Sequence, residues 1–489
     1  MSKRHRILII ALNGCGARLT HRPAGQLRRS RWSTPAKWVG ILAWLVWAHG
    51  LVADAAYAER ITVGVFDVDA SPPVGTPLAY DECVGVAMSL RARGVVLTGD
   101  EQPIVLCAVD WIGIANEGQT EWKRALAEAA GTTPERVSVH TLHQHDAPVC
   151  DFTTASILDE YQPHTPLVDE RFVRQTIERT ANSVRAAREN AKLVTHVGLG
   201  EALVHEVASN RRILGDDGKV RAVRYTACAD PAVRAEPVGT IDPYVKSITF
   251  YQEESPVAVL TFYATHPQSY YRTGVANPDF PGMARQLRQA TLNGIPHIHF
   301  DGAGGNIGAG KFNDGSPRNR QILAERLADG MADAWEASEK QAVDSMRMQW
   351  KTVSVRLPVS PHLDEESLLQ TLSDKRPDPL EARNAAAHLA WLRRCERGDA
   401  VEVSCLCLGP LRLLTLPGEP VVEYQLAAQK MRPDKFVAVA GYTDYGPGYI
   451  CLEEHYAQGG YEPSPRASRV APAVQSVLAA AIDEALGDD

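Results

Sequence analysis

Residues 137–148 read VSVHTLHQHDAP, an apolar, β-branched run that ends in His140 and leads directly into a loop with two more histidines, His143 and His145. Val137–His140 has the composition of a short strand, so the loop should follow the carboxyl end of that strand. A second apolar run, Val257–Tyr263 (VAVLTFY), is followed in the same way by His266. Functional residues in α/β proteins commonly lie at the carboxyl ends of strands. The sequence therefore predicts an α/β fold with its site at such an edge.

Strand-like and helix-like segments alternate along the rest of the chain. Apolar or β-branched runs predict further strands at Ile61–Phe66, Gly94–Leu97, Pro103–Val109, Pro296–Phe300, 348–358, Val401–Cys407, Leu411–Leu416 and Phe436–Val439. Length and composition predict helices at 119–130, 168–192, Gly282–Leu292, 318–338, 379–396, Pro420–Met431 and 470–486. This interleaving predicts a layered α/β architecture, in which mixed β-sheets are flanked by helices.

The first 58 residues have the features of a targeting segment. They contain nine Lys or Arg and a single Asp. The apolar run Trp38–Val52 is too short for the roughly 20 residues that span a bilayer as a helix, and the pattern Ala56-Tyr57-Ala58 follows it. This order predicts a signal peptide over 1–58, cleavage after Ala58, and export to the periplasm or beyond the cell. The alternative is an uncleaved N-terminal membrane anchor.

Charge and composition exclude several classes of protein. The 489 residues are 45% hydrophobic and 22% charged, which is typical of a globular protein and not of a disordered or collagen-like one. The formal net charge is −8, but because the first 58 residues are so basic, residues 59–489 carry −16. A protein with this much net negative charge repels phosphate groups. A nucleic-acid partner is therefore not expected.

Histidines and carboxylates in these segments are candidate metal ligands. In an extended segment His143 and His145 point to the same side, and imidazole suits zinc and similar ions. With His266, Glu419 and one oxygen donor, such residues satisfy a mononuclear zinc site with room for water. Each segment also has a structural interpretation: a histidine cluster in the core or at the surface, a hydrogen-bonded histidine, or tyrosines packed beneath the Gly441–Tyr449 loop.

Several motifs occur in the order found in the neutral/alkaline (non-lysosomal) ceramidase family, which the chain resembles over roughly residues 61–470. Their order along the chain is more specific than any one of them. The motifs are Arg91–Gly94 before Val109-Asp110, His143–Pro148, Asn210–Arg212, Phe262–Ser269, Pro278–Ala284, Pro417–Glu419 and Tyr449–Glu462.

The resemblance implies a zinc amidase that hydrolyses ceramide to sphingosine and fatty acid. It implies a single large catalytic domain over 59–489, without the family's C-terminal β-domain. The implied zinc ligands are His143, His266, Glu419 and Tyr449. The implied catalytic residues are His145, in a proton-handling or oxyanion role, and Tyr449. The implied substrate-binding residues are Asn306, Gly308, Lys311 and Arg211.

Three departures from the family pattern concern the substrate: the loop around Gly308, the residue at position 146, and the missing C-terminal β-domain. Gly308 and Asn306 stand where the family has a serine and an aspartate, and Asp146 stands where it has a serine beside the histidines. The glycines around Gly308 should bring backbone N–H groups close to a bound anion or carbonyl, and Lys311 should reach toward it. The alternative is a tight turn without a ligand.

The leading hypothesis is therefore an exported zinc hydrolase that cleaves the amide bond of an N-acylated lipid or related N-acyl compound, with peripheral contact to a membrane surface. The alternatives are an esterase or other hydrolase on the same site, and a non-catalytic protein that binds lipids or glycans. Arg211 and Asp279 are candidates to orient ligands or substrate. Cys150 follows the histidine loop and Cys451 follows Tyr449, which predicts a disulfide between them.

Overall fold

Three strand–helix–strand units, one in each of three large sheets, set the architecture. Each unit places its second strand parallel to the first, and neighbouring strands end level with one another, as in the pairs Val109↔Thr141, Tyr263↔Asp301 and Thr415↔Ala440. The units are β4 (Ile104–Val109), α2 (Asn116–Ala130) and β6 (Val137–Thr141); β14 (Ser255–Tyr263), α6 (Asp279–Thr291) and β16 (His297–Asp301); and β21 (Leu411–Thr415), α10 (Val422–Met431) and β23 (Phe436–Ala440).

The first sheet has the strand order β6-β4-β3-β1-β8 and is covered by α2 and by α4 (Glu170–Glu189). Its other strands are β3 (Arg91–Thr98), β1 (Thr62–Asp69) and β8 (Lys192–Leu193). Trp122 of α2 and Ile177 of α4 are buried against the outer face of this sheet. Both helices have polar residues on their other side, so their amphipathic pattern explains why they pack here.

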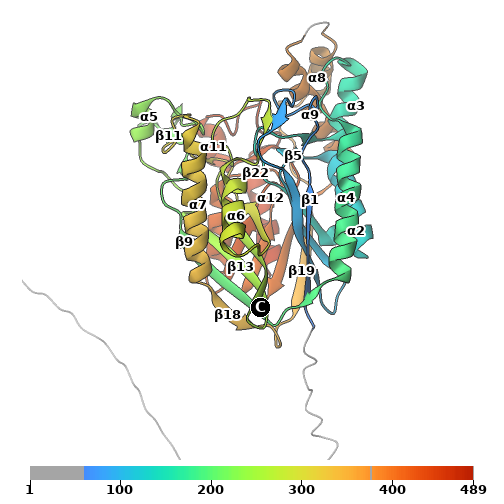
Figure 1. Cartoon of the computed structure of the whole chain (residues 1–489). Helices are drawn as coiled ribbons and strands as arrows, with labels where there is room; N and C mark the ends of the chain where they lie inside the picture. Colours follow the sequence, from blue (N-terminus) through green and yellow to red (C-terminus); the bar gives the residue numbers. More distant parts are fainter. Residues whose placement is uncertain (1–59, 375–376, 488–489) are drawn as a thin grey trace, which may run out of the picture. The chain divides into compact units, whose positions relative to one another are not determined.

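The second sheet has the order β16-β14-β13-β9-β18 and is covered by α6 and by α7 (Arg318–Glu336). Its other strands are β13 (Tyr244–Gln252), β9 (His196–Leu203) and β18 (Glu339–Ala342). The third sheet, in the order β19-β20-β21-β23, packs against α10 and α12 (Val474–Leu486). Its other strands are β19 (Met348–Val355) and β20 (Val401–Leu408). Figure 1 shows α2 and α4 along one side, α6 and α7 along the other, and strands between them.

The inner faces of the three sheets meet in one apolar core. This core contains Leu106 from the first sheet, Leu260 and Phe300 from the second, and Leu406 and Leu413 from the third, each at most 3% exposed. Because strand side chains alternate between faces, the opposite faces of the sheets pack against the helices. The packing fixes the relative positions of the three parallel strand pairs, and therefore of the loops that follow them.

Short elements complete the fold. Two-stranded sheets are formed by β2 (Gly85–Val86) with β15 (Val275–Ala276), β5 (Gly113–Ile114) with β7 (Val149–Cys150), β10 (Ser209–Asn210) with β17 (Ile307–Gly308), β11 (Arg212–Leu214) with β12 (Val220–Val223), and β22 (Glu419–Pro420) with β24 (Tyr449–Ile450). The remaining helices are α3 (Phe152–Tyr161), α5 (Pro231–Ala235), α8 (Glu365–Leu372), α9 (Pro379–Glu396), α11 (Glu453–Gln458) and the 3₁₀ turn Pro134–Arg136.

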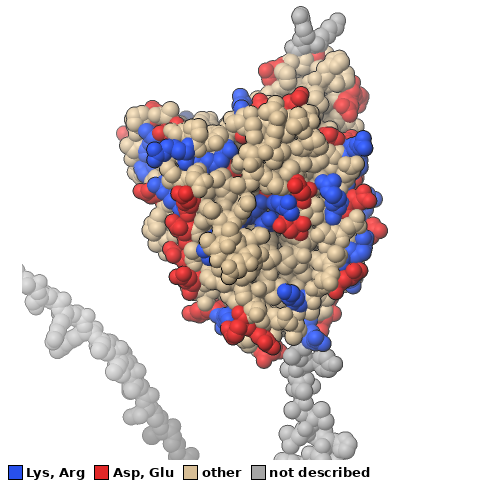
Figure 2. Space-filling model, viewed as in Figure 1, with Lys and Arg blue, Asp and Glu red and all other residues tan. Residues whose placement is uncertain are grey.

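The predicted layered α/β class is confirmed, with mixed sheets flanked by helices in one domain. The computed structural model describes residues 60–374 and 377–487, so the predicted signal peptide over 1–58 lies outside the described residues. Within the described part of the chain, no helix is both long and apolar enough to span a bilayer. On the face in Figure 2, acidic side chains follow the edge over α7 and basic ones gather near α5 and β11.

Candidate metal centre

The loops after the parallel strands of all three sheets converge on one cluster of polar side chains. His143 follows β6 of the first sheet, His266 follows β14 of the second, and Glu419 follows β21 of the third. The side chain of Glu419 lies between the two histidines, with its Oε2 atom 3.2 Å from Nε2 of each. His143 and His266 are each 1% exposed and Glu419 is 2% exposed. Segments far apart in the sequence thus form one buried cluster.

Tyr449 joins this cluster through strand pairing. Glu419 and Tyr449 are register partners in the parallel pair β22–β24. The Tyr449 hydroxyl lies 3.1 Å from Nε2 of His266, and the two rings are stacked. The loop can approach so closely because Gly418 has a φ of +66°, and a Cβ there would lie 2.6 Å from the carbonyl oxygen of Gly448.

Backbone carbonyls fix the orientation of the two histidine rings. His143 Nδ1 lies 2.6 Å from the carbonyl oxygen of Ile112, and His266 Nδ1 lies 2.8 Å from that of Gly304. A carbonyl only accepts hydrogen bonds, so both Nδ1 atoms carry the proton and both Nε2 atoms present a lone pair to Glu419. His143 also adopts a left-handed φ of +60°, which costs about 1 kcal/mol and is typical of functional sites.

The donor set fits a metal ion. Two Nε2 lone pairs face a carboxylate oxygen, and Oε2 of Glu419 has no hydrogen-bond partner in the described structure. Burial lowers the pKa of His266 to about 4, which keeps the ring neutral. Neutral imidazole and ionised carboxylate are the forms that bind metal, and a cation removes the repulsion between their lone pairs.

His145 lies beside this cluster, but its ring is neutral in the other tautomer. Ligand atoms of His143, His145 and His266 lie within 4.8 Å of one another, so the three histidines alone could also hold an ion. However, Gln268 Nε2 donates to His145 Nδ1 at 3.1 Å, and Thr226 Oγ1 donates to Gln268 Oε1 at 3.0 Å. The proton of neutral His145 is therefore on Nε2, which is buried without a partner. This arrangement makes His145 a hydrogen-bond donor, whereas Oε2 of Glu419 offers a lone pair to an ion.

Arg211 lies on the other side of Tyr449. Its guanidinium donates to the Tyr449 hydroxyl at 3.1 Å, pairs with buried Glu462 at 3.1 Å, and also donates to the carbonyl of Gly305. Burial raises the pKa of Tyr449 well above its ordinary value, although Arg211 opposes this effect. Arg211 therefore fixes the phenol and provides a positive charge next to it.

Tyrosine rings surround the histidines. Tyr442 stacks on His143 with centroids 4.7 Å apart, and Tyr80 stacks on His145 at 5.5 Å. Tyr271 contacts both Tyr80 and His145, and Tyr461 packs against Tyr449. His145 is only partly buried, in contrast to His143 and His266. The cluster is therefore nearest to solvent at His145, and we call the rim that Tyr80 and Tyr271 form there the mouth of the site.

Of the three predicted substrate-binding residues in the loop 305–313, only Gly308 lies beside the cluster. Gly308 lies next to it, because a Cβ at this position would be 3.2 Å from Thr226 Oγ1 and 3.4 Å from Cδ of Arg211. Asn306 instead accepts a hydrogen bond from the N–H of Val422 and donates to Glu423, so its side chain holds the start of α10. Lys311 donates to backbone carbonyls at the end of α5, which differs from its predicted reach into the site.

Two other expectations concern residues around the site. The predicted disulfide is wrong: Cys150 and Cys451 are free thiols, and they are buried in different cores, the first against the sheet β6-β4-β3-β1-β8 and the second beside α12. Asp279 does support a site segment, since it accepts hydrogen bonds from the N–H and hydroxyl of Ser269 and pairs with Arg320. Burial raises the pKa of Asp279.

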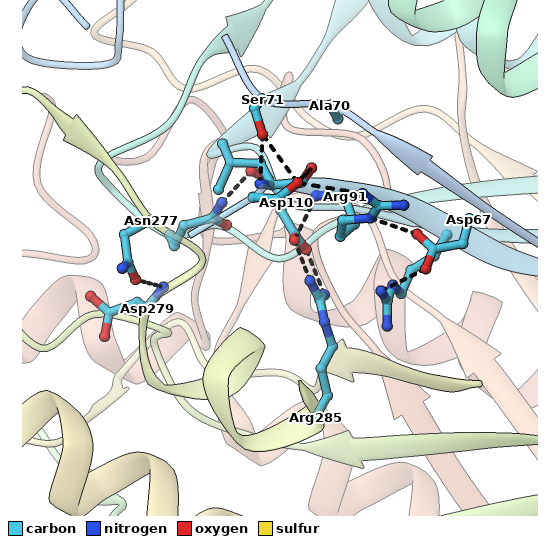
Figure 3. Close-up of polar contacts among 12 residues, drawn as sticks. Asp67, Ala70, Ser71, Arg91, Asp110, Asn277, Asp279 and Arg285 are labelled. Carbon is cyan, nitrogen blue, oxygen red and sulfur yellow. Dashed lines mark hydrogen bonds and ion pairs between the residues drawn. The ribbon is translucent and has the colours of Figure 1, made fainter. Parts of the chain in front are cut away.

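Another buried ion pair, between Asp110 and Arg285, supports the histidine loop (Figure 3). Asp110 directly follows β4 and forms a bidentate pair with Arg285 of α6, in which Nη1 lies 2.6 Å from Oδ1. Asp110 also accepts a hydrogen bond from the N–H of Arg91, and its carbonyl accepts one from the side chain of Gln144. Because Gln144 lies between His143 and His145, the pair anchors the segment that carries both.

Sequence reasoning identified the cluster itself but not its surroundings. His143, His145, His266, Glu419, Tyr449 and Arg211 are brought together. Thr226, Tyr80 and Tyr271 were missed, because they lie in irregular segments without a motif. Gln268 was missed although it is two residues from His266, and its amide next to a candidate ligand was the available signal.

The fold is similar to that of solved ceramidases. The sequence matches no protein-family model and no curated protein. A neutral ceramidase from Pseudomonas aeruginosa superposes with a TM-score of 0.62 and 16% identity over 88% of this chain and 74% of that chain. A structure described as ceramidase complexed with C2 gives the same score and identity, with 88% and 75% coverage. The predicted resemblance is thus confirmed for the fold.

Proposed function

We propose that this chain is a zinc-dependent hydrolase of the ceramidase type, which cleaves the amide bond of an N-acylated lipid or related N-acyl compound. The observation that carries the proposal is the position of Glu419 Oε2, without a hydrogen-bond partner, 3.2 Å from the two Nε2 atoms of His143 and His266. Two nitrogens, a carboxylate and the phenol of Tyr449 are donors that zinc accepts in catalytic sites. The similarity in fold to neutral ceramidases supports the same reaction class.

In this proposal His143, His266, Glu419 and Tyr449 hold the ion. Bound zinc lowers the pKa of a water ligand and polarises a carbonyl group. Tyr442 and Tyr449, stacked on the two histidines, restrict access of bulk water to the buried side of the cluster. Arg211 keeps the Tyr449 hydroxyl in place through its hydrogen bond.

His145 supplies the remaining chemistry. Its Nε2–H has no partner in the described protein and belongs to the one histidine of the cluster that is only partly buried, where we place the substrate carbonyl oxygen. Donation to that oxygen stabilises the negative charge that develops when the carbonyl carbon becomes tetrahedral. Gln268 and Thr226 hold the tautomer that this donation needs. His145 and Tyr449 are thus the proposed catalytic residues, while Gln268 and Thr226 position His145.

Metal analysis tests the metal centre. The purified chain should contain about one zinc per chain, and His266→Ala and Glu419→Gln should contain far less. His164→Ala, at an exposed histidine outside the cluster, is the matched control and should keep the ion. Equal metal content in all four proteins would sink the proposed centre.

A substrate panel tests the bond that is cleaved. N-Acyl amides and acyl esters of equal chain length should both be offered to the zinc-loaded protein. Faster turnover of the amides supports the amidase, whereas turnover of esters alone replaces it with an esterase. Ligand binding without any turnover replaces it with a lipid- or glycan-binding protein.

We further propose export of the mature chain through residues 1–58, with the membrane surface as a peripheral contact. N-terminal sequencing of the exported protein should begin at Glu59, and retention of Trp38 contradicts cleavage.

A further inference from the structure

A small pocket lies next to the mouth of the candidate site. It has a volume of about 290 Å³ and is lined by Tyr80, Arg272, Asp378, Leu380 and Arg383. Tyr80 connects it to the reaction centre, since the same ring stacks on His145. Asp378 and Leu380 lie at the start of α9. In Figure 1, α9 lies toward the same end of the molecule as β22, the strand that contains Glu419. The pocket therefore adjoins the open side of the site.

Arg272 is held at this pocket by its backbone and not by its side chain. Its N–H and the N–H and hydroxyl of Thr273 donate to the buried carboxylate of Asp146, the residue after His145. The guanidinium lies over two tyrosine rings, 5.1 Å from the centroid of Tyr80 and 5.7 Å from that of Tyr271. Among the described residues it has no hydrogen bond or ion pair, so its donors are available.

Arg383 approaches the same pocket from α9. It donates to the carbonyl oxygens of Ala79 at 3.2 Å and Pro166 at 2.7 Å, and its Nε is buried without a partner. No carboxylate of the described residues lies within ion-pair distance of it. The one acid in the pocket, Asp378, already accepts the N–H groups of Leu380 and Glu381 as the cap of α9. Two guanidinium groups without carboxylate partners thus face one small volume.

We propose that this pocket binds an acidic group of the substrate. Guanidinium groups bind carboxylate and phosphate with the strong, charge-assisted bonds that these anions prefer. His145 and Arg272 contact the same Tyr80 ring, so a carbonyl bonded to His145 and an anion bonded to Arg272 can belong to one molecule. The substrate class is therefore an N-acyl compound with a carboxylate or phosphate, such as an N-acyl amino acid. This inference rests on the proposed function and narrows it, because ceramide is uncharged.

The test compares two substrates that differ only in their terminal group, which is charged in one and neutral in the other. N-Lauroylglycine carries a carboxylate where N-lauroylethanolamine carries a hydroxymethyl group. The zinc-loaded chain should prefer the glycine conjugate in kcat/KM, and Arg272→Gln should reduce this preference about tenfold. Arg383→Lys, which keeps the charge but loses the fork geometry, should reduce it less. Arg185→Gln, on the exposed face of α4, is the control and should leave the preference unchanged.

The source of the anion and the failure modes can be separated. N-Lauroylphosphoethanolamine in the same assay distinguishes a phosphate from a carboxylate. The conjugate whose anion the pocket binds better should show the larger fall in kcat/KM in Arg272→Gln. Turnover with an unchanged preference in Arg272→Gln overturns the pocket but keeps the hydrolase. If neither conjugate is hydrolysed, calorimetric binding of N-lauroylglycine decides: weaker binding to Arg272→Gln keeps the pocket, and equal binding overturns it.

Discussion

Glu419 pairs directly with Tyr449 across the parallel strands β22 and β24. These strands follow β21 and β23, the two parallel strands of the third sheet, so a carboxylate and a phenol come to lie side by side. His143 and His266 complete the arrangement from the other two sheets. The donor set therefore depends on backbone pairing and not on flexible side chains, which suits a preorganised site.

Replacing the carboxylate should weaken metal binding. Glu419→Gln keeps the shape of the side chain but removes its negative charge, and zinc affinity should fall on the order of tenfold or more. Competition with a chromogenic chelator measures the affinity. Glu454→Gln, at an exposed acid on α11, is the control, and equal affinities for the two variants would contradict the ligand role.

Reversing the hydrogen bond to His145 should lower kcat. Gln268→Glu places an acceptor opposite Nδ1, which favours the tautomer with its proton on Nδ1 and removes the donor at Nε2. Loss of one such donor costs about 10²–10³ in kcat. Metal content should stay unchanged, and ¹⁵N NMR of His145 should report the new tautomer.

Thr226 offers a second route to the same result. Thr226→Val removes the hydroxyl that orients the amide of Gln268, whereas Thr226→Ser keeps it. We expect a lower kcat for the valine variant and recovery in the serine variant. Equal kcat values for both variants would argue against the positioning role.

Low pH should destabilise the fold through buried histidines. Burial lowers the pKa of His297 to about 3, whereas an unfolded histidine has a pKa of about 6.5. The unfolded chain binds the extra proton, so stability is lost as the pH falls from about 6.5 toward 3. His297→Gln should reduce the pH slope of the unfolding free energy by up to about 1.4 kcal/mol per pH unit. The exposed-site variant His164→Gln should leave the slope unchanged.

Breaking the pair between Asp110 and Arg285 should be costly. Arg285→Met leaves a buried carboxylate without its partner, which typically costs about 3–5 kcal/mol of unfolding free energy. The double variant Asp110→Asn/Arg285→Met should be less destabilised, because no charge is left uncompensated. Arg393→Met, in a half-exposed pair with Glu365, should cost less than about 1 kcal/mol. Urea denaturation distinguishes these cases.

Local pattern was enough for most of the fold. The predicted strand Pro103–Val109, helix 119–130 and strand Val137–His140 correspond to β4, α2 and β6, because apolar runs and helical spacing are local properties. β9 and β13 were missed. β9 is interrupted by Gly198 and Gly200, and β13 buries Ser247 and Thr249, so neither gives a continuous apolar signal.

The arrangement of the site was harder to predict than its members. Motifs pointed to His143, His266 and Glu419, but their convergence depends on the packing of three sheets against one core. The tautomer of His145 depends on Thr226, which is 42 residues from Gln268 in the sequence. Lys311 was misplaced because nothing in its sequence indicates the carbonyl groups at the end of α5 that hold it.

His143, His266 and Glu419 each follow a strand of a different sheet. The cluster therefore exists only once all three sheets have folded and packed together. A fragment with one or two of the sheets lacks part of it, so high-affinity metal uptake should be a late event during refolding. For the same reason an ion held there acts as a cross-link between distant segments, and a chelator should lower the thermal midpoint. On the proposed function, metal occupancy should therefore report complete assembly of the three sheets.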